Sequence, residues 1–375
     1  MKLLKILIGT ALLSLMIACQ KDKDLISGLN PEDFVTEIND KPTALYVLRN
    51  KNGMEVALTN YGGRIISIMV PDKDGKYRDV VLGFDNIDDY LQISNNFGAT
   101  IGRYGNRIAN GKITLNGENI QLPRNNFGHC LHGGDQGWDS KVMEARYIDR
   151  QTIEMSYVSP DGEANFPGTV QASVTFSLTD DNSIRLDYSA TTDKTTIINM
   201  TNHSYFNLNG RPDCGVMDHM MYLNADAYTP IDSTFMTTGE IAAVEGTPMD
   251  FRIPKKIGRD INTDFQQLHN GRGYDHNWVL STSGNLNNIA AKVWSEESGI
   301  QLEVYTDEPG IQVYTGNFLD GSFKGKYRLK YVNRASVCLE TQHFPDSPNK
   351  SDWPSVVLEP GETYTSTCIY KFTLK

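Results

Sequence analysis

The sequence contains few cysteines, and none of them form a closely spaced pair. Its 375 residues include 5 Cys, and no Cys-x-x-Cys motif occurs. This pattern argues against a thiolate zinc site. Beyond residue 19 the cysteines are Cys130, Cys214, Cys338 and Cys368, too few to form a disulfide scaffold in a domain of this size. We expect Cys338 and Cys368, which lie in strand-like runs, to be small buried hydrophobic residues.

The sequence also lacks an excess of basic residues. Lys and Arg number 35 against 46 Asp and Glu, a net charge of −11. A nucleic-acid partner is not expected, because binding one requires a basic face. A sugar phosphate is disfavoured as substrate for the same reason. The glycine-rich segment at residues 102–107 is not followed by the Lys-Ser/Thr of a phosphate loop. Its arginines are better suited to donating hydrogen bonds to sugar hydroxyls or to orienting a carboxylate.

No apolar run is long enough to span a bilayer comfortably. The longest one near the start, residues 6–18, has 13 residues. Lys2 and Lys5 precede it and a polar stretch follows, which is typical of a signal peptide. The segment from Leu15 to Cys19 resembles a bacterial lipobox, with Met16 where Leu is usual. We therefore expect removal of residues 1–18 and lipidation of Cys19. The alternative is an ordinary secretory signal, with Cys19 incidental.

This signal predicts an exported protein anchored in a membrane through Cys19, at the periplasmic face or cell surface of a bacterial envelope. Residues 19–40 have little periodic pattern and are interpreted as a polar tether after the lipidated cysteine. Residues 41–375 contain no linker or repeat and are expected to form a single catalytic domain. We expect a monomer.

Helical periodicity is scarce in this domain, and strand signals dominate. Apolar and polar residues alternate over 170–178 and 184–190, with a turn composition between them, which predicts a hairpin. Residues 300–304, 311–314 and 368–374 alternate in the same way. Only residues 87–93 and 265–269 favour short helices, with Asn86 and Asp264 as N-caps. Many strands and few helices indicate an all-β fold, a large antiparallel sandwich.

Two segments place acid–base side chains at the ends of predicted strands. His203 follows a strand-like run and has Asn199, Asn202 and Ser204 close by in sequence. Glu340 follows the apolar run 336–339 and should lie where the chain leaves the sheet. An imidazole and a carboxylate can act as general acid and general base near neutral pH.

Two further segments are weaker candidates. His129 and His132 are three residues apart, but no third ligand is close in sequence, so a metal pair is poorly supported. Asp275 lies beside aromatic residues and could accept hydrogen bonds from two neighbouring hydroxyls, or could be a plain turn residue.

Several of these segments, in this order, resemble the motifs of the aldose 1-epimerase (galactose mutarotase) family. They are Gly102–Arg107, His132–Gly134, Asn202–Tyr205, Tyr274–His276, Pro309–Phe318 and Glu340–Asn349. One departure is Tyr104-Gly105, where the family more often has Val-Ala. The resemblance covers nearly the whole chain after about residue 40 and implies a galactose mutarotase-like β-supersandwich.

The resemblance also implies roles for individual residues. His203 would be the proton donor and Glu340 the proton acceptor in interconverting the α and β anomers of a free aldose. The implied sugar contacts are Asn106, Arg107, His132, Tyr205, Asp275 and Gln312. The chemistry needs no metal and no cofactor. For ring opening His203 must be charged, and we expect a nearby carboxylate such as Asp275 to favour that form.

Three other functions remain open at this point. A glycoside hydrolase would use Glu340 and Asp275 as its carboxylate pair, which leaves His203 unexplained. A non-catalytic sugar-binding surface lipoprotein would not need an acid–base pair. An epimerase of phosphorylated sugars would need basic residues at the mouth of its pocket.

Overall fold

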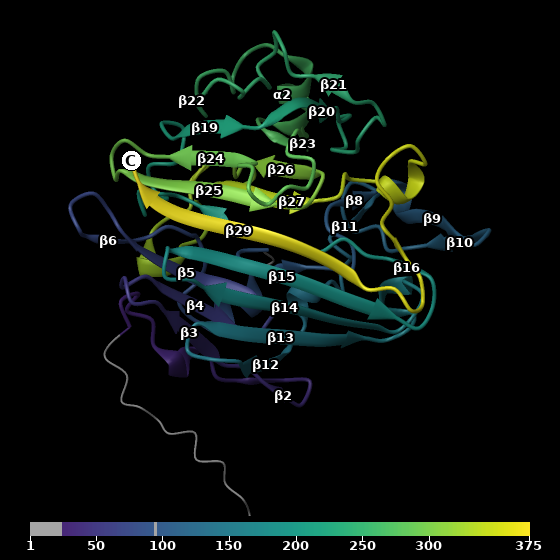
Figure 1. The fold of residues 1–375 in the computed structure, drawn as a ribbon, viewed down its shortest axis with the longest axis horizontal. Coiled ribbons are helices and arrows are strands. Elements are labelled where there is room, and N and C mark those ends of the chain that lie inside the picture. The colour runs from purple at the N-terminus through teal and green to yellow at the C-terminus, as the bar shows by residue number, and fades with distance from the viewer. Residues whose placement is uncertain (1–24, 94–95) are drawn as a thin grey trace, which may run out of the picture.

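The computed structural model describes residues 25–93 and 96–375, and strands dominate it (Figure 1). Every strand pair recorded between these elements is antiparallel, and two larger sheets form the centre. The described residues include two short α-helices, α1 (Ile87–Gln92) and α2 (Gln266–Gly271). The predicted fold class, an all-β antiparallel sandwich with few short helices, is therefore confirmed.

A nine-stranded sheet fills the front of Figure 1. In spatial order it contains β12 (Glu144–Tyr147), β13 (Thr152–Ser159), β14 (Val170–Leu178), β15 (Ser183–Thr192), β29 (Tyr364–Leu374), β25 (Ile300–Thr306), β24 (Ala291–Trp294), β19 (Met220–Leu223) and β22 (Lys255–Lys256). The predicted hairpin is β14 with β15, and its apolar positions are buried while alternate residues are partly exposed. The C-terminal strand β29 lies between β15 and β25, so residues far apart in sequence close the middle of the sheet.

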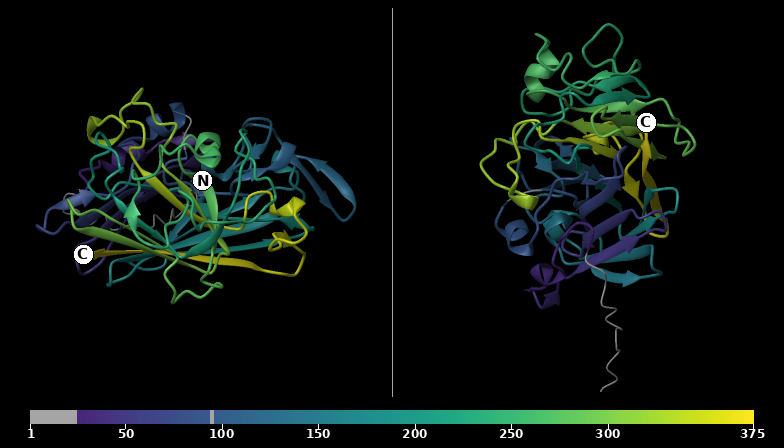
Figure 2. Two further views of the ribbon diagram at one scale, coloured as in Figure 1. Left: turned by 90° about the horizontal axis from the view of Figure 1, so that it is seen from above. Right: turned by 90° about the vertical axis from the view of Figure 1, so that its left-hand side faces the viewer.

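A six-stranded sheet packs against the first one and carries most of the site. Its strands, in spatial order, are β18 (Tyr205–Phe206), β27 (Val337–Gln342), β26 (Gly310–Tyr314), β23 (Asp275–Leu280), β20 (Ala225–Thr229) and β21 (Ala242–Ala243). Residues 307–309 connect β25 of one sheet directly to β26 of the other. The Phe206 and Tyr370 rings meet at 5.0 Å between the sheets, and the Tyr370 hydroxyl donates to the Leu339 carbonyl at 3.0 Å. Figure 2 shows the layers from two further sides.

Smaller elements surround these two sheets. A four-stranded sheet contains β3 (Leu45–Arg49), β4 (Glu55–Thr59), β5 (Arg64–Pro71) and β6 (Tyr77–Asp79). The two-stranded pairs are β1 (Glu37–Ile38) with β2 (Lys41–Pro42), β7 (Thr100–Ile101) with β17 (Thr201–Asn202), β8 (Arg107–Ile108) with β11 (Cys130–Leu131), β9 (Lys112–Leu115) with β10 (Glu118–Gln121), and β16 (Thr196–Ile197) with β28 (Val357–Leu358). Short 3-10 turns occupy Pro31–Phe34, Ala109–Gly111, Trp138–Ser140, Glu163–Asn165, Lys326–Arg328 and Ser347–Asn349.

Both predicted helices form, but only one has the predicted cap. The Asn86 side chain accepts a hydrogen bond from the Asp89 amide at 2.9 Å, as an N-cap does at the start of a helix. The second helix has Phe265 at its N-cap position and no side-chain cap. The prediction of Asp264 as N-cap is therefore wrong. Its carboxylate instead lies 2.9 Å from His269 Nε2.

The tether predicted for residues 19–40 is wrong in its second part. From residue 25 onward the chain packs on the domain, and the Leu29 and Phe34 side chains are buried. The Glu55 carboxylate accepts the backbone N–H groups of Ile26 and Ser27 at 3.1 and 3.0 Å. These amides and apolar contacts hold the segment although its sequence has little periodicity. Cys19 and the signal segment lie outside the described residues.

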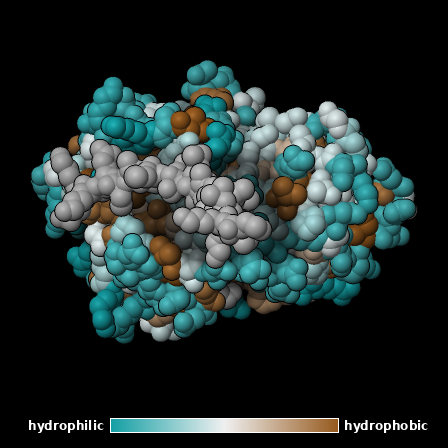
Figure 3. Space-filling model, turned by 90° about the horizontal axis from the view of Figure 1, so that it is seen from below, coloured by the Kyte–Doolittle hydropathy of each residue, from teal (hydrophilic) through white to brown (hydrophobic). Residues whose placement is uncertain are grey.

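None of the helices among the described residues is long and apolar enough to cross a membrane. Seen from below, the exposed face is mainly hydrophilic with scattered apolar residues (Figure 3). Such scattered residues are normal for a folded surface. Cys338 and Cys368 are buried free thiols, as predicted for small core residues.

Two histidines outside the set of predicted site residues, His219 and His276, are buried in neutral form. His219 Nε2 accepts the Leu208 amide at 3.0 Å, and His276 Nδ1 accepts the Asp275 amide at 3.1 Å. A ring nitrogen that accepts an N–H cannot carry a proton. Burial accordingly lowers the pKa of His219 to about 4 and that of His276 to about 3. Both rings therefore resist protonation while the protein is folded.

We predict that His219 contributes stability that is lost in mild acid. Its folded pKa lies below the ordinary value of 6.5, so the unfolded chain binds the proton more tightly and stability falls as the pH drops from 6.5 toward 4. His219→Gln keeps an acceptor but cannot titrate. The gap in unfolding free energy between wild type and variant should narrow by about 2 kcal/mol between pH 7 and pH 5. Urea unfolding followed by circular dichroism measures it, and a gap independent of pH would contradict the prediction.

Candidate active site

A single cavity of about 510 Å³ gathers all the residues predicted for catalysis and sugar contact. Its lining includes Asn106, Arg107, His132, His203, Tyr205, Asp275, Gln312 and Glu340. These residues come from segments spread over more than two hundred positions of the chain. The fold thus brings together what the sequence could only place at separate strand ends and loops.

One face of the six-stranded sheet supplies the floor of this cavity. Gln312 in β26 lies directly opposite Glu340 in β27, and Asp275 in β23 lies opposite Tyr314. Because alternate residues of a strand share a face, Gln312 and Tyr314 project to the same side, together with Asp275 and Glu340. Gln312 Nε2 donates to Asp275 Oδ1 at 2.7 Å and so fixes both side chains.

Glu340 lies within β27, not where the chain leaves the sheet. The prediction of a strand-end carboxylate is wrong, since Glu340 is the fourth of the six residues of β27, all of which are buried. Only 2% of Glu340 is exposed, and its Oε2 atom has no hydrogen-bond partner among the described residues. A buried carboxylate oxygen without a partner is costly for folding. Such an atom in a cavity indicates a group placed for a ligand.

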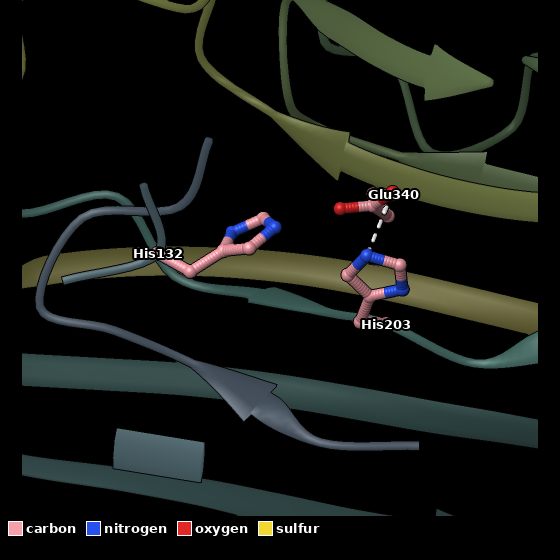
Figure 4. A group of neighbouring side chains, drawn as sticks. All are labelled: His132, His203 and Glu340. Atoms are coloured by element: carbon pink, nitrogen blue, oxygen red, sulfur yellow. Dashed lines mark ion pairs between the residues drawn. The ribbon is translucent and has the colours of Figure 1, made fainter. Parts of the chain in front are cut away.

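His203 lies between β17 and β18 and points at this carboxylate (Figure 4). The distance from His203 Nε2 to Glu340 Oε1 is 3.6 Å. The imidazole stacks on the Tyr205 ring, with centroids 4.8 Å apart and planes 14° from parallel. His132 meets it edge-on at 5.3 Å. Two aromatic neighbours therefore hold the ring while its Nε2 faces the cavity.

Burial decides the charge of this pair. It lowers the pKa of His203 from 6.5 to about 3. Burial also raises the pKa of Glu340 well above its usual value, with Asp275 adding to this effect and Arg107 opposing it. The expectation that Asp275 keeps His203 charged is therefore wrong. A dry environment disfavours two separated charges, so the pair favours a neutral imidazole.

A tight loop pair presents Arg107, Asn106 and His132 on the other wall. Arg107 in β8 pairs with Leu131 in β11, which brings His132 close to Asn106. Asn106 and His132 both adopt left-handed backbone conformations, with φ of 66° and 54°. The Asn106 amide donates to His132 Nδ1 at 3.1 Å, and Arg107 Nε donates to Asn126 Oδ1 at 3.1 Å. These bonds orient the side chains before any ligand is bound.

The grouping of His132, His203 and Glu340 is poorly suited to a metal ion. Their ligand atoms lie within 4.8 Å of one another. However, His132 Nδ1 accepts a backbone N–H, so the ring proton is on Nε2, the nitrogen that would have to bind the metal. The weaker candidate pair fails as well, because His129 is engaged elsewhere. It accepts the Asn110 amide on Nδ1 and contacts Thr234 Oγ1 through Nε2 at 2.8 Å.

Comparison with known proteins shows the family of this chain. The sequence model of the family described as Aldose 1-epimerase matches residues 44–371. This chain belongs to the aldose 1-epimerase family. Galactose mutarotase from Rattus norvegicus is 42% identical over 321 residues, which are 86% of this chain and 92% of that protein. Aldose 1-epimerase from Escherichia coli K12 is 39% identical over 335 residues, 88% and 96% of the two chains.

Solved structures resemble the fold as well. A GalM/aldose epimerase homologue from C. elegans has a TM-score of 0.82 at 30% identity, covering 88% of this chain and 99% of that one. Galactose 1-epimerase from Lactobacillus acidophilus has a TM-score of 0.80 at 29% identity, with coverage of 90% and 97%. The family therefore extends over nearly the whole described domain.

Several residues that line the cavity were not predicted from the sequence. The cavity is also lined by Asn96, Asn125, Asn126, Leu131, Gly134, Asp135, Asp139, Tyr314 and Phe318. Tyr314 could have been found, because it lies two residues after Gln312 on a strand and thus shares its face. The loop residues carried no such periodic signal. Arg103 is not part of the cavity, since its guanidinium binds Ser159 Oγ at 2.6 Å and the Gly168 carbonyl at 2.9 Å.

We predict that His132 stays neutral with its proton on Nε2. The Asn106 amide would lose its acceptor if Nδ1 were protonated, and burial lowers the pKa of His132 well below its ordinary value. The ¹⁵N shifts of the His132 ring should be unchanged from pH 8 to pH 5 and on adding Zn²⁺. A ring that titrates near pH 6.5, or that shifts with zinc, would restore the metal interpretation.

Proposed function

We propose that this protein is an aldose 1-epimerase that interconverts the α and β anomers of free aldohexoses such as glucose and galactose. The observation that carries the proposal is the His203–Glu340 pair, 3.6 Å apart in a cavity lined by hydrogen-bonding side chains. Membership of the family supports it. Ring opening needs one group to take the proton of the C1 hydroxyl and another to donate a proton to the ring oxygen, and the pair supplies both.

The reaction opens the sugar ring and closes it on the other face of C1. During opening, the Glu340 carboxylate takes the proton of the C1 hydroxyl and His203 donates a proton from Nε2 to the ring oxygen. The C–O bond of the ring breaks and the C1 carbonyl forms. Rotation about the C1–C2 bond then presents the other carbonyl face. On closure His203 takes the proton of the C5 hydroxyl as that oxygen attacks C1, and Glu340 returns its proton to the C1 oxygen. No proton is gained or lost overall.

The pair therefore holds one proton, in two arrangements of equal total charge. With the proton on His203 the site can open the ring, and with the proton on Glu340 it can close the open-chain aldehyde. Burial favours the second arrangement through the pKa shifts of the two groups. The Arg107 guanidinium lowers the pKa of Glu340 and so favours the first. Burial is the larger effect, so the empty site favours the arrangement with the proton on Glu340, and Arg107 reduces this preference.

The remaining side chains position the sugar. Burial raises the pKa of Asp275, while Arg107 and the hydrogen bond from Gln312 oppose this effect. Its carboxyl oxygens can accept hydrogen bonds from sugar hydroxyls. His132 can donate from Nε2, and the Gln312 Oε1 atom has no partner among the described residues. The Tyr205 and Tyr314 rings offer apolar surface for C–H groups. Each group is oriented by the protein before the sugar arrives.

We predict that Glu340→Gln lowers kcat by about 10²- to 10⁴-fold, because the amide cannot take a proton. Polarimetry of freshly dissolved α-glucose and α-galactose measures the rate. Glu308→Gln is the matched control, since Glu308 is likewise 2% exposed but does not line the cavity. The control should keep near wild-type activity. A Glu340→Gln variant that equilibrates the anomers at the wild-type rate would refute the assignment.

We further propose that the protein acts as an exported lipoprotein anchored through Cys19. The support is the sequence alone, a charged start followed by a 13-residue apolar run that ends at this cysteine. We also propose that the monomer is the active form, because one chain supplies both the His203–Glu340 pair and the implied sugar contacts.

We predict that Cys19→Ser moves the protein from the membrane fraction to the soluble fraction of cells that process lipoproteins, because the acyl chains supply the anchoring. Ultracentrifugation and immunoblotting measure the distribution. Cys214→Ser, which changes an exposed cysteine of the domain, is the control and should stay with the membrane. A Cys19→Ser protein that remains membrane-bound would exclude anchoring through this residue.

A further inference from the structure

A row of three phenylalanine rings leads from the cavity to the surface. Phe318 lines the cavity and lies parallel to Tyr314 within 29°, with centroids 6.3 Å apart. Phe235 follows at 5.5 Å from Phe318, and Phe127 follows at 5.2 Å from Phe235. We call Phe318, Phe235 and Phe127 the aromatic rim. It is continuous with the cavity at one end and open to solvent at the other.

The rim exposes apolar surface that the fold does not need. Phe318 is 45% exposed and Phe127 is 50% exposed. Phe127 and Phe235 also adopt left-handed backbone conformations, with φ of 46° and 65°. This conformation is strained for a bulky residue. Strain and exposed rings occurring together at the mouth of a site indicate a role in binding.

Polar contacts hold the two loops that carry the strained rings. His129 Nδ1 accepts the Asn110 amide, so Nε2 bears the ring proton and donates it to Thr234 Oγ1 at 2.8 Å. The Thr234 hydroxyl in turn donates to Asp232 Oδ1 at 2.5 Å. This chain of bonds joins the loop before β11 to the loop after β20. The rim is therefore a fixed platform rather than two independent loops.

The rim is also tied to groups inside the cavity. The Arg107 guanidinium lies over the Phe235 ring at 5.2 Å, and its Nε binds Asn126, the neighbour of Phe127. Asn125 and Asn126 line the cavity, whereas Phe127 itself does not. A ligand that reaches Phe127 must therefore extend beyond the cavity. Amides beside flat rings match a sugar, which has hydroxyls at its edge and C–H groups on its faces.

We propose that the aromatic rim binds the second and following units of a reducing oligosaccharide whose terminal unit lies between His203 and Glu340. This inference rests on the proposed function and adds subsites to it. The reducing unit undergoes anomer exchange inside the cavity. The glycosidically linked units stack on Phe318 and then toward Phe127. They pass Asn125 and Asn126, whose side chains are oriented by the Leu131 backbone and by Arg107. The rim residues thus determine which chain lengths the enzyme uses well.

The test compares glucose with maltotriose and cellotriose for the wild type and for variants at Phe127. Phe127→Gly removes the ring and suits the left-handed backbone, so it should fold. Phe127→Trp restores an aromatic face. Ile253→Ala is the control, because Ile253 is an apolar side chain 81% exposed that does not line the cavity. Anomer exchange is measured by NMR at the C1 proton, and binding by saturation transfer to the protons of each sugar unit.

We expect Phe127→Gly to keep the wild-type kcat/KM for glucose and to lower that for at least one trisaccharide roughly three- to tenfold. Saturation transfer to its outer units should weaken, and Phe127→Trp should restore both. Two results would overturn the inference. In one, Phe127→Gly has the wild-type kcat/KM for each of the three sugars. In the other, it loses kcat/KM for glucose by the same factor as for both trisaccharides. If the wild type failed to exchange glucose anomers, the proposed function would fall, while saturation transfer to the outer units would still decide whether the rim binds sugar.

Discussion

The pairing of three strands determines where the chemistry can occur. Gln312 lies opposite both Glu340 and Asn277, so β23, β26 and β27 present Asp275, Gln312 and Glu340 on one face of the sheet. A slip of one residue in this register would turn the carboxylates to the opposite face and separate them from His203. The nine-stranded sheet packs on the opposite face of these strands and holds their register. From it, the Tyr370 hydroxyl donates a hydrogen bond to the carbonyl of Leu339, the residue before Glu340. The site therefore depends on the sandwich core more than on its own loops.

The same packing makes the cavity energetically expensive. Glu340 Oε2, His203 Nδ1 and Gln312 Oε1 are buried without a hydrogen-bond partner among the described residues. Each such group costs about 1–3 kcal/mol of stability. The large core between the sheets can offset this cost, because apolar burial grows with domain size. The charge balance of the His203–Glu340 pair follows from the same exclusion of water, and proton exchange between them depends on it.

The sequence predicted individual strands better than it predicted which strands lie side by side in a sheet. Alternation identified β14 and β15 correctly, because one side of each strand faces the core. It could not show that β29 lies between β15 and β25, or that residues 307–309 cross from one sheet to the other. Glu340 was expected at a strand end, since a polar residue in a fully buried strand contradicts the usual pattern. The predicted site residues share one cavity, yet Tyr314 and Asn126 were missed, and the charge of His203 depends on burial that no sequence motif reveals.

Under the proposed anchoring through Cys19, the packed segment from residue 25 onward would limit how far the domain can move from a bilayer. Directly after residue 25, the backbone amides of Ile26 and Ser27 bind Glu55 of β4 and hold the chain on the domain. With Cys19 as the lipidated residue, six peptide steps connect it to Leu25, and fully extended they reach about 20 Å. A linker of this length would hold the enzyme against the lipid headgroups and restrict its rotation. Sugars would then have to approach from the sides and the outward face, so the orientation of the cavity relative to the membrane would govern their access.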